Sequence, residues 1–596
     1  MDGRFSFGRF ILDEKARVLT FDGLHLDIQP KVFDVLAYLV RNAGRVVPKS
    51  ELMDAIWPSL HVTEASLQRA VSLARSALAR GGLGDAIRSH VRLGYRFAVD
   101  RPDLAGLLPS GAEPDERTAS AREACRTRRW AAAADAFAQA AATDPLGPED
   151  LDLWAVTLEC LARPSDGLPL LVDAVTRHAA AGRPVEAARS AINLARLHLE
   201  RAETAVARGW LVRAQSFLDH GPETDAHALL VWMRARFAAF EGRPEEARDL
   251  AAEAQAIAGR AAPVGVRALT LAYLGFFNIS LGRAAEGLEQ QDHAAAMALS
   301  GQVDPIMGSL IYCNILWSCR SFADWSRGSQ WSGGFETWCH ANFARLSGAC
   351  QLHRAEILGA RGVLGDALAG IDRAIEALAA TEPWALGDAY RVRGDIQAMR
   401  GDAAAAMSDY RVAYERGWDA EPGHAILLFE AGDTEGALSA LDGVLAGAGW
   451  FSLQRRGWIV ANKARIAALA GRLDTARDCV RELSDSYDSW PSQAIRAMTL
   501  EAQARIACED DRSPTRLLVL ARQLWTSMGA DYQVARVRLE LAEVLSASGQ
   551  GAGALVEADL AARGAQRIGA LRLHERARLL ALRLAPDAAR KSLPAC

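Results

Sequence analysis

The sequence predicts a multidomain protein in which a small α+β domain precedes a long all-α array of helical hairpins. Three observations support this prediction. The chain has 596 residues, too many for one hydrophobic core. Strand and helix signals alternate in the first hundred residues, whereas the remainder is rich in Ala and Leu and has almost no strand signal. Along that remainder, a glycine followed five residues later by a small residue recurs many times.

The net charge of −5 averages over two unlike parts of the chain. The first hundred residues hold 14 Lys and Arg against 11 Asp and Glu, whereas the remainder holds 54 against 62. The N-terminal part is therefore weakly basic, which is compatible with a nucleic-acid partner, and the two parts have to be interpreted separately.

Two absences point to a cytoplasmic protein with no membrane partner. The longest apolar stretch, residues 307–319, is shorter than the roughly 20 residues that span a bilayer. The N-terminus shows no apolar segment or cleavage site of a secretory signal. Nine cysteines, none in a C-x-x-C pair, are then expected to be reduced thiols packed in cores.

The first elements of the N-terminal domain are predicted from turn residues and apolar spacing. Alternating apolar residues flank Asp22-Gly23, which is typical of a two-residue turn, so residues 18–28 are predicted to form a β-hairpin. A helix is predicted from Pro30 to a C-cap at Gly44. A second helix is predicted to begin at Pro48 after a short extended segment.

A third helix is predicted over residues 63–80, and it has two unlike faces. One face is a buried apolar stripe at helical spacing, made by Leu67, Val71, Ala74 and Leu78. At about 100° per residue, the opposite face is polar and basic with no acidic residue. It carries Gln68, Arg69, Ser72, Arg75 and Ser76.

After a glycine-rich break, residues 87–100 are predicted to form a second hairpin with its turn near residues 92–94. The polar side of this hairpin carries Arg88, His90, Arg92 and Arg96. Hairpin strands, three helices and a basic hairpin, in that order, make a winged helix-turn-helix.

The residues also resemble the OmpR/PhoB-type winged-helix output domain. The matching pieces cover most of residues 5–98 and are "FGRFILD", "IQPKVFDVLAYLVRNAGRVVPKSELMDAIW", "TEASLQRAVSLARSAL" and "GYRF". The resemblance implies that the third helix enters the DNA major groove and that the hairpin, or wing, reaches the neighbouring minor groove. One departure is Arg92, which stands where the family commonly has a Gly before the wing tip.

The resemblance implies a role for each polar position of this domain. Gln68, Arg69 and Ser72 would face base edges, where Arg can bind guanine and Gln adenine through two hydrogen bonds. Phosphate contacts, which set register without specifying bases, would come from Arg75, Arg92, Lys49 and the helix start at Thr63 and Ser66. Arg92 and Arg96 would belong to the wing. The alternative is a solvated helix face on a domain that binds protein.

Residues 101–119 are rich in Pro, Gly and acidic residues and are predicted to be a linker, and residues 586–596 a tail. Between them, residues 120–585 are predicted to form an α-solenoid. Each glycine would end one helix, and the small residue would let the next helix pack closely. The pairs are Gly182/Ala187, Gly209/Ala214, Gly242/Ala247, Gly282/Gly287, Gly362/Ala367, Gly401/Ala406, Gly432/Ala437, Gly471/Ala476 and Gly549/Ala554, with Arg129/Ala134 as a degenerate first copy.

This pattern resembles degenerate tetratricopeptide repeats, for which "GDAYRVRGDIQAMRGDAAAAMSDYRVAYERG" is the best copy. Stretches such as "CQLHRAEILGARGVLGDAL" and "EPGHAILLFEAGDTEGAL" also resemble the helical region of large LuxR-family regulators. Both resemblances imply an architecture that binds partners, and neither implies chemistry.

One segment of the predicted solenoid is rich in Trp, Cys and His. Tyr312, Trp317, Trp338 and His353 are candidates for a ligand or peptide site, and Cys350 with His353, or Cys339 with His340, could ligate a metal. The simpler interpretation is that these side chains fill helical-repeat cores. We expect no metal and no cofactor.

No enzyme signature is present. The chain lacks G-x-x-x-x-G-K-[ST] and H-E-x-x-H, and no G-x-S-x-G follows a strand. Its five lysines are Lys15, Lys31, Lys49, Lys463 and Lys591.

We therefore predict a non-enzymatic, one-component transcriptional regulator. The winged helix would read double-stranded promoter DNA as a dimer, and the solenoid would sense a small ligand or recruit a protein, with RNA polymerase as a further candidate partner. Because the winged helix begins at the first residues, a preceding receiver domain and control by aspartyl phosphate are not expected. Two alternatives are an interaction scaffold whose winged helix binds protein, and an enzyme with an unrecognised site in the Trp-rich segment.

Overall fold

A computed structural model describes residues 4–7, 10–21, 24–26, 28–43, 46–57, 64–79, 83, 86–90, 94–97, 118–344, 346–447, 449–509 and 514–585. The chain forms two compact units, Met1–Pro102 and Asp103–Cys596. Several sequence predictions fall outside the described residues: Thr63, Arg92, the linker over residues 101–117 and the tail over residues 586–596.

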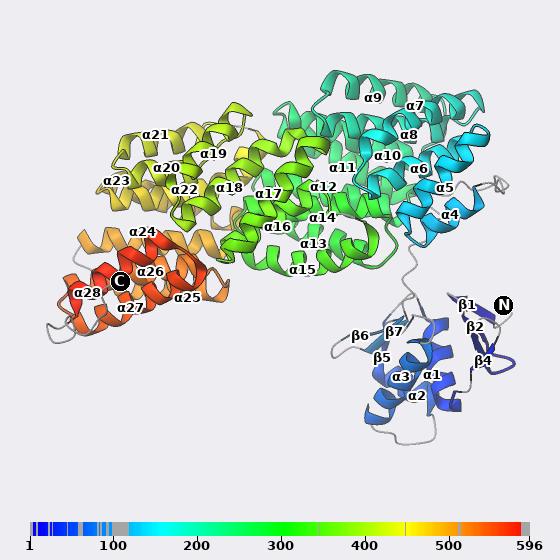
Figure 1. The fold of residues 1–596 in the computed structure, drawn as a ribbon, viewed down its shortest axis with the longest axis horizontal. Helices are drawn as coiled ribbons and strands as arrows, with labels where there is room; N and C mark the ends of the chain where they lie inside the picture. Colours follow the sequence, from blue (N-terminus) through cyan, green and yellow to red (C-terminus); the bar gives the residue numbers. More distant parts are fainter. Residues whose placement is uncertain are drawn as a thin grey trace. The chain divides into compact units, whose positions relative to one another are not determined.

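In its described residues, the N-terminal unit combines two antiparallel sheets with three helices (Figure 1). One sheet has four strands in the order β1-β2-β3-β4, and the other has three in the order β5-β7-β6. The predicted hairpins are confirmed as β3 (Val18–Phe21) with β4 (Leu24–Leu26) and β6 (Ile87–His90) with β7 (Gly94–Phe97). The predicted helices are confirmed as α1 (Pro30–Arg41), α2 (Lys49–Ile56) and α3 (Glu64–Ala79), and the extended segment before α2 as β5 (Val47–Pro48). The C-cap of α1 is Asn42, two residues before the predicted position. The unit also contains β1 (Arg4–Phe7) and β2 (Phe10–Asp13).

The core of this unit lies where α1 packs on α3. The predicted apolar stripe of α3 is confirmed, because all four of its side chains are at most 1 % exposed. Removing a Leu side chain from water contributes roughly 1.5–3 kcal/mol. The stripe therefore fixes the rotation of α3, and its polar face is turned away from the core.

The second unit is an array of helices that pair into hairpins (Figure 1). Two short 3-10 turns, η3 (Pro383–Ala385) and η4 (Tyr487–Ser489), interrupt it. Its helices are α4 (Ala119–Arg126), α5 (Trp130–Thr143), α6 (Pro148–Cys160), α7 (Pro164–Ala180), α8 (Pro184–Glu200), α9 (Thr204–Leu218), α10 (Asp225–Phe240), α11 (Pro244–Ala261), α12 (Val264–Ser280), α13 (Ala284–Leu299), α14 (Pro305–Ser321), α15 (Trp325–Asn342), α16 (Gly348–Ala360), α17 (Leu364–Thr381), α18 (Leu386–Arg400), α19 (Ala403–Glu415), α20 (Gly423–Glu430), α21 (Thr434–Leu445), α22 (Trp450–Leu469), α23 (Leu473–Asp485), α24 (Gln493–Glu509), α25 (Thr515–Ser527), α26 (Asp531–Ala547), α27 (Gly551–Ile568) and α28 (Leu571–Leu584).

The predicted glycine turns are confirmed at eight positions. At these positions φ is positive, a conformation that glycine adopts without steric cost, and the small residue five positions later is buried or packs against the preceding helix. The eight are Gly182, Gly242, Gly282, Gly362, Gly401, Gly432, Gly471 and Gly549.

The predicted turn at Gly209 is wrong, because Gly209 lies inside α9. The left-handed residue of that hairpin is Ala202, at φ 61°. The degenerate first copy is displaced by one residue, with Arg128 at φ 57° in place of Arg129. Ala162 and Ala323 take the same conformation. A non-glycine residue costs roughly 1–2 kcal/mol in this region, so close helix packing can outweigh it.

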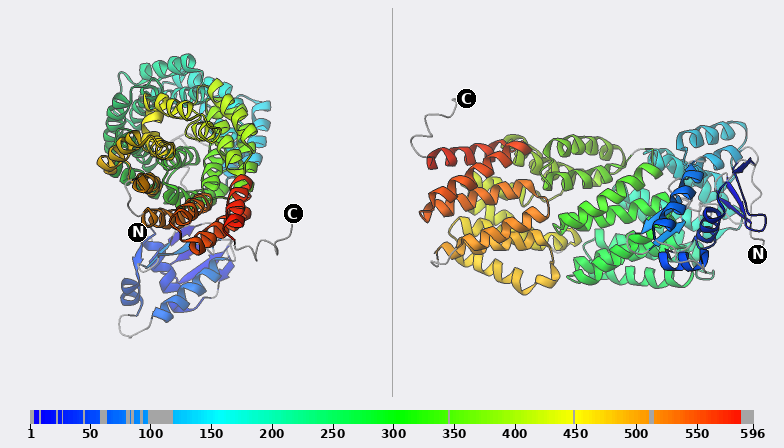
Figure 2. Two further views of the ribbon diagram at one scale, coloured as in Figure 1. Left: turned by 90° about the vertical axis from the view of Figure 1, so that its left-hand side faces the viewer. Right: turned by 90° about the horizontal axis from the view of Figure 1, so that it is seen from below.

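The array coils so that hairpins distant in sequence meet. Seen end-on, its helices wind around a common axis (Figure 2). Gln454 on α22 donates from Nε2 to the Phe276 carbonyl at 3.1 Å and to Ser280 Oγ at 3.0 Å, both on α12. Ser492 Oγ donates to the Ala323 carbonyl at 2.9 Å. These contacts clasp the coil at points more than four helices apart in the chain.

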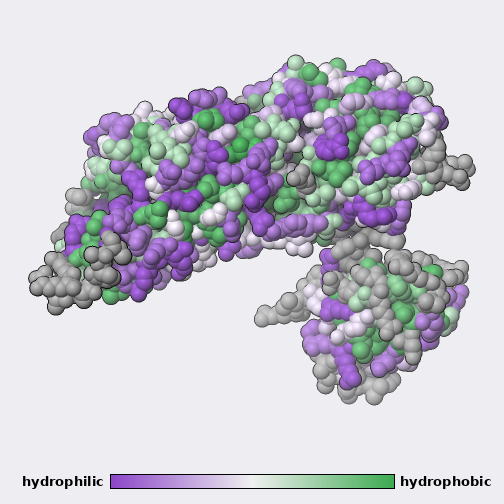
Figure 3. All heavy atoms as spheres, in the orientation of Figure 1, coloured by the Kyte–Doolittle hydropathy of each residue, from purple (hydrophilic) through white to green (hydrophobic). Residues whose placement is uncertain are grey.

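The surface of the array is mixed in polarity. In the view of Figure 3, hydrophilic side chains are interspersed with isolated apolar ones. Large exposed apolar side chains such as Val212, Val556 and Leu571 lie on different helices. Within the described residues, every helix is too short or too polar to cross a bilayer.

Candidate nucleic-acid interface and helical-array cavity

The outward face of α3 carries the predicted base-reading residues. Gln68, Arg69 and Ser72 are exposed, as is Ser66 near the start of the helix. Neither Gln68 nor Arg69 forms a side-chain hydrogen bond or ion pair with a described residue. Their donors are therefore available to an external partner.

One further residue of this face was not predicted. Leu73 is 38 % exposed on α3, between the polar positions. The sequence signal was an apolar residue outside the buried stripe. An exposed aliphatic side chain on such a helix can contact a thymine methyl group.

Arg75 has a different setting from the other polar residues of α3. It is half-buried, and its Nε and Nη2 donate to the Ile87 carbonyl on β6 at 2.8 and 2.6 Å. Nη2 also donates to Ser89 Oγ at 2.9 Å. Arg75 therefore braces the wing against α3. The phosphate contact of Arg75 stays a prediction, and it would use Nη1, the remaining terminal nitrogen.

The wing brings two arginines together. β6 and β7 pair so that Arg88 lies directly opposite Arg96. This register concentrates positive charge on the wing. Arg96 Nε is buried without a hydrogen-bond partner. The sequence places Arg88 on the polar side of the hairpin without predicting a DNA contact for it. Its position opposite Arg96 makes it a further candidate residue of the wing.

Gly94 is required where β7 meets β5. A Cβ at this position would lie 1.9 Å from the Val47 carbonyl oxygen, which is backbone and cannot move aside. This contact explains the glycine of "GYRF", since it permits the pairing of Pro48 with Gly94 and of Val47 with Tyr95. Lys49 follows directly as the first residue of α2 and is half-buried, and its phosphate contact stays a prediction.

The four candidate ligand residues of the helical array fall into two groups. Trp317 and His353 line a cavity of about 780 Å³. Tyr312 is fully buried, and its ring lies 4.6 Å from that of Phe335 and 5.6 Å from that of Trp338. Tyr312 and Trp338 thus pack into a core beside the cavity and do not line it.

His353 is held as a neutral acceptor. Its Nδ1 accepts a hydrogen bond from Arg320 Nη1 at 2.6 Å. Burial, together with the charge of Arg320, lowers the pKa of His353 well below its ordinary value. Trp317 stacks on Trp384, with ring centroids 5.7 Å apart. Trp317 and the neutral His353 therefore make their part of the cavity wall aromatic and uncharged.

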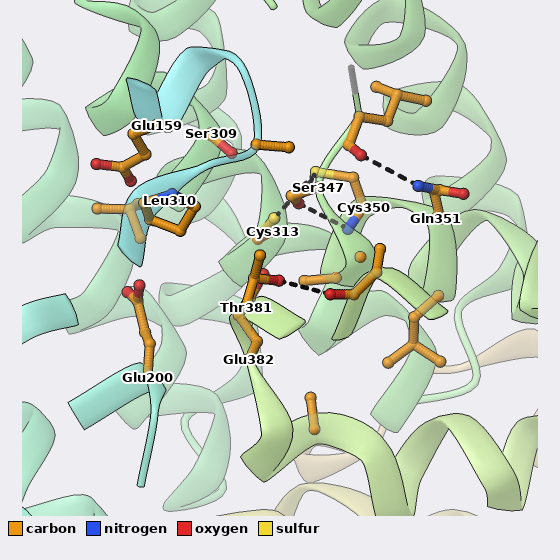
Figure 4. Close-up of a pocket in the computed structure, with 18 of the residues that line it drawn as sticks. Glu159, Glu200, Ser309, Leu310, Cys313, Ser347, Cys350, Gln351, Thr381 and Glu382 are labelled. Carbon is orange, nitrogen blue, oxygen red and sulfur yellow. Dashed lines mark hydrogen bonds between the residues drawn. The ribbon is translucent and has the colours of Figure 1, made fainter. Parts of the chain in front are cut away.

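Carboxylates and thiols also line the cavity (Figure 4). Glu159 and Glu200 pair with Arg196 at 2.7 and 3.0 Å. Among the described residues, Glu382 forms no ion pair, and burial together with the nearby Glu200 raises its pKa to about 8. The sulfur atoms of Cys313 and Cys350 lie 3.4 Å apart.

Neither Cys and His pair is arranged as a metal site. His353 turns its Nδ1 to Arg320, and His340 is 67 % exposed whereas Cys339 is buried. Within the described part of the chain, no group of three or more His, Cys, Asp or Glu is placed to hold a metal ion.

Comparison with known proteins places the N-terminal unit in a family. Residues 23–97 match the family described as "Transcriptional regulatory protein, C terminal". The chain is 31% identical over 115 residues to Transcriptional regulator HilA of Salmonella typhi, which covers 19% of this chain and 20% of that protein. It is 36% identical over 56 residues to Sensory transduction protein RegX3 of Mycobacterium leprae, 9% of this chain and 28% of that protein.

The match thus spans about a fifth of the length of HilA. The chain is also similar to two crystal structures, each at 12% identity and covering 77% of this chain. They are the APC/C hetero-tetramer Cut9-Hcn1, covered to 95% at a TM-score of 0.30, and a Rap protein complexed with Competence and Sporulation Factor, covered to 98% at 0.21. At these TM-scores, the two structures carry no argument about the fold of this chain. Residues 23–97 form an OmpR/PhoB-type DNA-binding domain, and the chain joins this transcriptional-regulator domain to a helical-repeat array.

Proposed function

We propose that the chain is a one-component regulator that binds promoter DNA in a sequence-specific way. The observation that carries this proposal is the exposed, unpartnered pair Gln68 and Arg69 on α3 of a DNA-binding-type domain. The pair supplies hydrogen-bond donors for guanine and adenine edges. Ser66 and Ser72 are further exposed polar side chains of the same helix. Lys49, Arg92 and Arg96 are proposed to add cationic contacts to DNA.

Several finer points belong to the same proposal. The protein binds a repeated site as a dimer, with α3 in the major groove and the wing in the minor groove. Arg88 acts with Arg96 in the wing, since the two residues lie directly opposite each other on β6 and β7 and present two cations to the DNA backbone. Because its partner is chromosomal DNA, the protein acts in the cytoplasm.

The helical array is proposed to sense a small ligand or to recruit a protein, RNA polymerase included. The support is a cavity of about 780 Å³, within the range of small-molecule sites, lined by aromatic side chains together with carboxylates, arginines and thiols. Deleting residues 120–596 should then change regulated expression or promoter affinity. If both are unchanged, the sensing role is wrong.

The test of DNA reading compares genome-wide binding of the wild type with Gln68→Ala/Arg69→Ala. We expect discrete promoter peaks that the double variant loses. Arg41→Ala is the matched control, because it removes an exposed cation from α1 of the same unit. If the double variant keeps all peaks, or the control loses them too, α3 is not the specific reader.

The competing function is an interaction scaffold whose N-terminal unit binds protein. Salt separates the two functions, because each neutralised phosphate adds about −0.9 to the slope of log affinity against log salt. A DNA reader should show a steep slope that shrinks in Arg96→Ala. A protein-binding module should show no binding to duplex DNA.

A further inference from the structure

A second cavity, of about 630 Å³, lies inside the coil of the helical array. Its wall includes residues of the first helix of each hairpin, which are α14, α16, α18, α20, α22, α24 and α26, and residues of α28. Its volume is within the range of about 300–1,000 Å³ for sites that enclose small organic molecules.

Arginines outnumber carboxylates on this wall. The carboxylates are Glu356, Asp388, Asp395, Glu430, Glu540 and Glu543. The arginines are Arg320, Arg391, Arg455, Arg465, Arg505, Arg536, Arg572 and Arg576. Glu501, directly behind the wall, adds one more negative charge. One cation therefore remains in excess.

The charges near α18 form a closed set. Asp388, with no exposed surface, accepts from Arg320 Nη2 at 2.8 Å and Arg391 Nη2 at 2.7 Å. Glu356 accepts from the same Arg391 at 3.0 Å and pairs with Arg320. Because each carboxylate already meets two guanidinium groups, this set holds the helices together.

The charges near α24 leave one arginine incompletely paired. Glu501, also without exposed surface, accepts from Arg536 Nη1 at 2.6 Å and Nη2 at 2.9 Å, and from Trp525 Nε1 at 2.7 Å. Arg465 reaches this carboxylate only through Nε, at 3.2 Å. Within the described residues, the two terminal nitrogens of Arg465 have no hydrogen-bond partner.

The surroundings of Arg465 disfavour its own charge. Its side chain is 16 % exposed, and burial together with the adjacent Arg536 lowers its pKa from the ordinary value. A partly buried cation beside a second cation gains when an anion arrives, since Coulomb interactions are strong where water is scarce. The open fork of a guanidinium matches a carboxylate or phosphate through two parallel hydrogen bonds.

Apolar side chains complete the wall beside this guanidinium. Trp458, Ile466, Leu469, Met498 and the ring of Tyr532 line the same cavity. Together they suit an aromatic or aliphatic body of limited size rather than a free inorganic ion.

We propose that this cavity binds a small organic anion, an aromatic or apolar body with one carboxylate or phosphate group that Arg465 binds through its two terminal nitrogens. Binding requires only the helical array. That the anion is the signal of the regulator rests on the proposed function, and promoter occupancy tests that function separately.

The test is calorimetric titration of the full chain with three probes of similar shape: phenylacetate, phenyl phosphate and neutral phenylacetamide. We expect saturable binding of at least one anion and at least tenfold weaker binding of the amide. Arg465→Gln should weaken anion binding about ten- to a hundredfold, the range for a charged hydrogen bond. The preference between the two anions identifies the group as carboxylate or phosphate.

Two further variants keep the test decisive. Arg411→Gln removes an exposed arginine of α19, outside the cavity, and should bind the anion as the wild type does. Arg465→Lys keeps the charge but not the fork, so its affinity should be intermediate, and it serves if Arg465→Gln does not fold. Equal binding of amide and anion, no binding of either anion, or unchanged affinity in both Arg465 variants would overturn the proposal.

Discussion

The two units use arginine in opposite ways. On α3 of the N-terminal unit, Arg69 is exposed and unpaired among the described residues. In the helical array, Arg320, Arg391 and Arg536 are almost buried and each bonds a buried carboxylate. An exposed arginine that is available to DNA and a buried arginine that stabilises the fold cannot be told apart from the residue type. Only the surroundings distinguish them.

The largest expected effect tests the role of the buried arginines in stabilising the fold. Asp388→Ala should destabilise the array by about 3–5 kcal/mol, because Arg320 and Arg391 stay buried and Glu356 is then the one carboxylate that they share. Urea unfolding followed by circular dichroism measures the loss. The matched control Glu415→Ala breaks an exposed pair with Arg411 and should cost less than about 1 kcal/mol. Equal costs for the two variants would contradict the comparison.

Arg75 is the intermediate case, because it belongs to the N-terminal unit and yet fixes β6 of the wing to α3. Arg75→Met should destabilise that unit by about 1–3 kcal/mol, since the Ile87 carbonyl loses its side-chain donor. Hydrogen exchange of β6 amides should report the loosened wing. Affinity should fall equally for all DNA sequences. A change of preferred sequence without faster exchange would instead place Arg75 among the base-reading residues.

Arg69 tests the role of an exposed arginine that is available to DNA. Arg69→Ala should leave the unfolding midpoint unchanged, because the side chain has no partner among the described residues. Discrimination at one base position should fall by about 1–3 kcal/mol. Selection of bound sequences from a random duplex library measures it. Equal weakening at every position would identify Arg69 as a phosphate contact.

Glu382 provides the smallest effect, and its sign can be worked out. Its folded-state pKa of about 8 lies above the ordinary value, so the folded protein binds more protons than the unfolded chain between the two. Its contribution to stability is therefore lost as pH rises from about 4.3 toward 8. In Glu382→Gln this part of the pH dependence should vanish, on the order of 1 kcal/mol because the cavity admits water. Identical pH profiles would show that Glu382 is ionised in the folded state.

Much of the fold could be predicted because it follows from the spacing of apolar residues and glycines along the chain. The stripe from Leu67 to Leu78 repeats at helical spacing, and the glycines that end helices need a conformation few other residues take. The turn at Ala202 was not predicted, because no glycine marks it. An alanine can take the left-handed conformation at a modest cost, and the composition of the segment then carries no signal of the turn.

The candidate sites were less predictable than the fold. The exposed face of α3 follows from the position of its buried stripe, so Gln68 and Arg69 could be placed from sequence. The bond from Arg75 to Ile87 depends on how β6 lies against α3, and helical spacing contains no information about that. Likewise, Trp317 and Tyr312 are five residues apart on one helix, yet only Trp317 lines the cavity.

The clasps of the coil have a consequence for how the array unfolds. An open repeat array behaves as a one-dimensional chain, in which each hairpin contacts its neighbours and ends can fray independently. The bonds from Gln454 to α12 and from Ser492 to Ala323 connect hairpins that such a chain would keep apart. Opening one hairpin then removes support from another far along the sequence. The array should therefore melt as a cooperative block, and binding energy gained at one point of the coil would stabilise its distant turns.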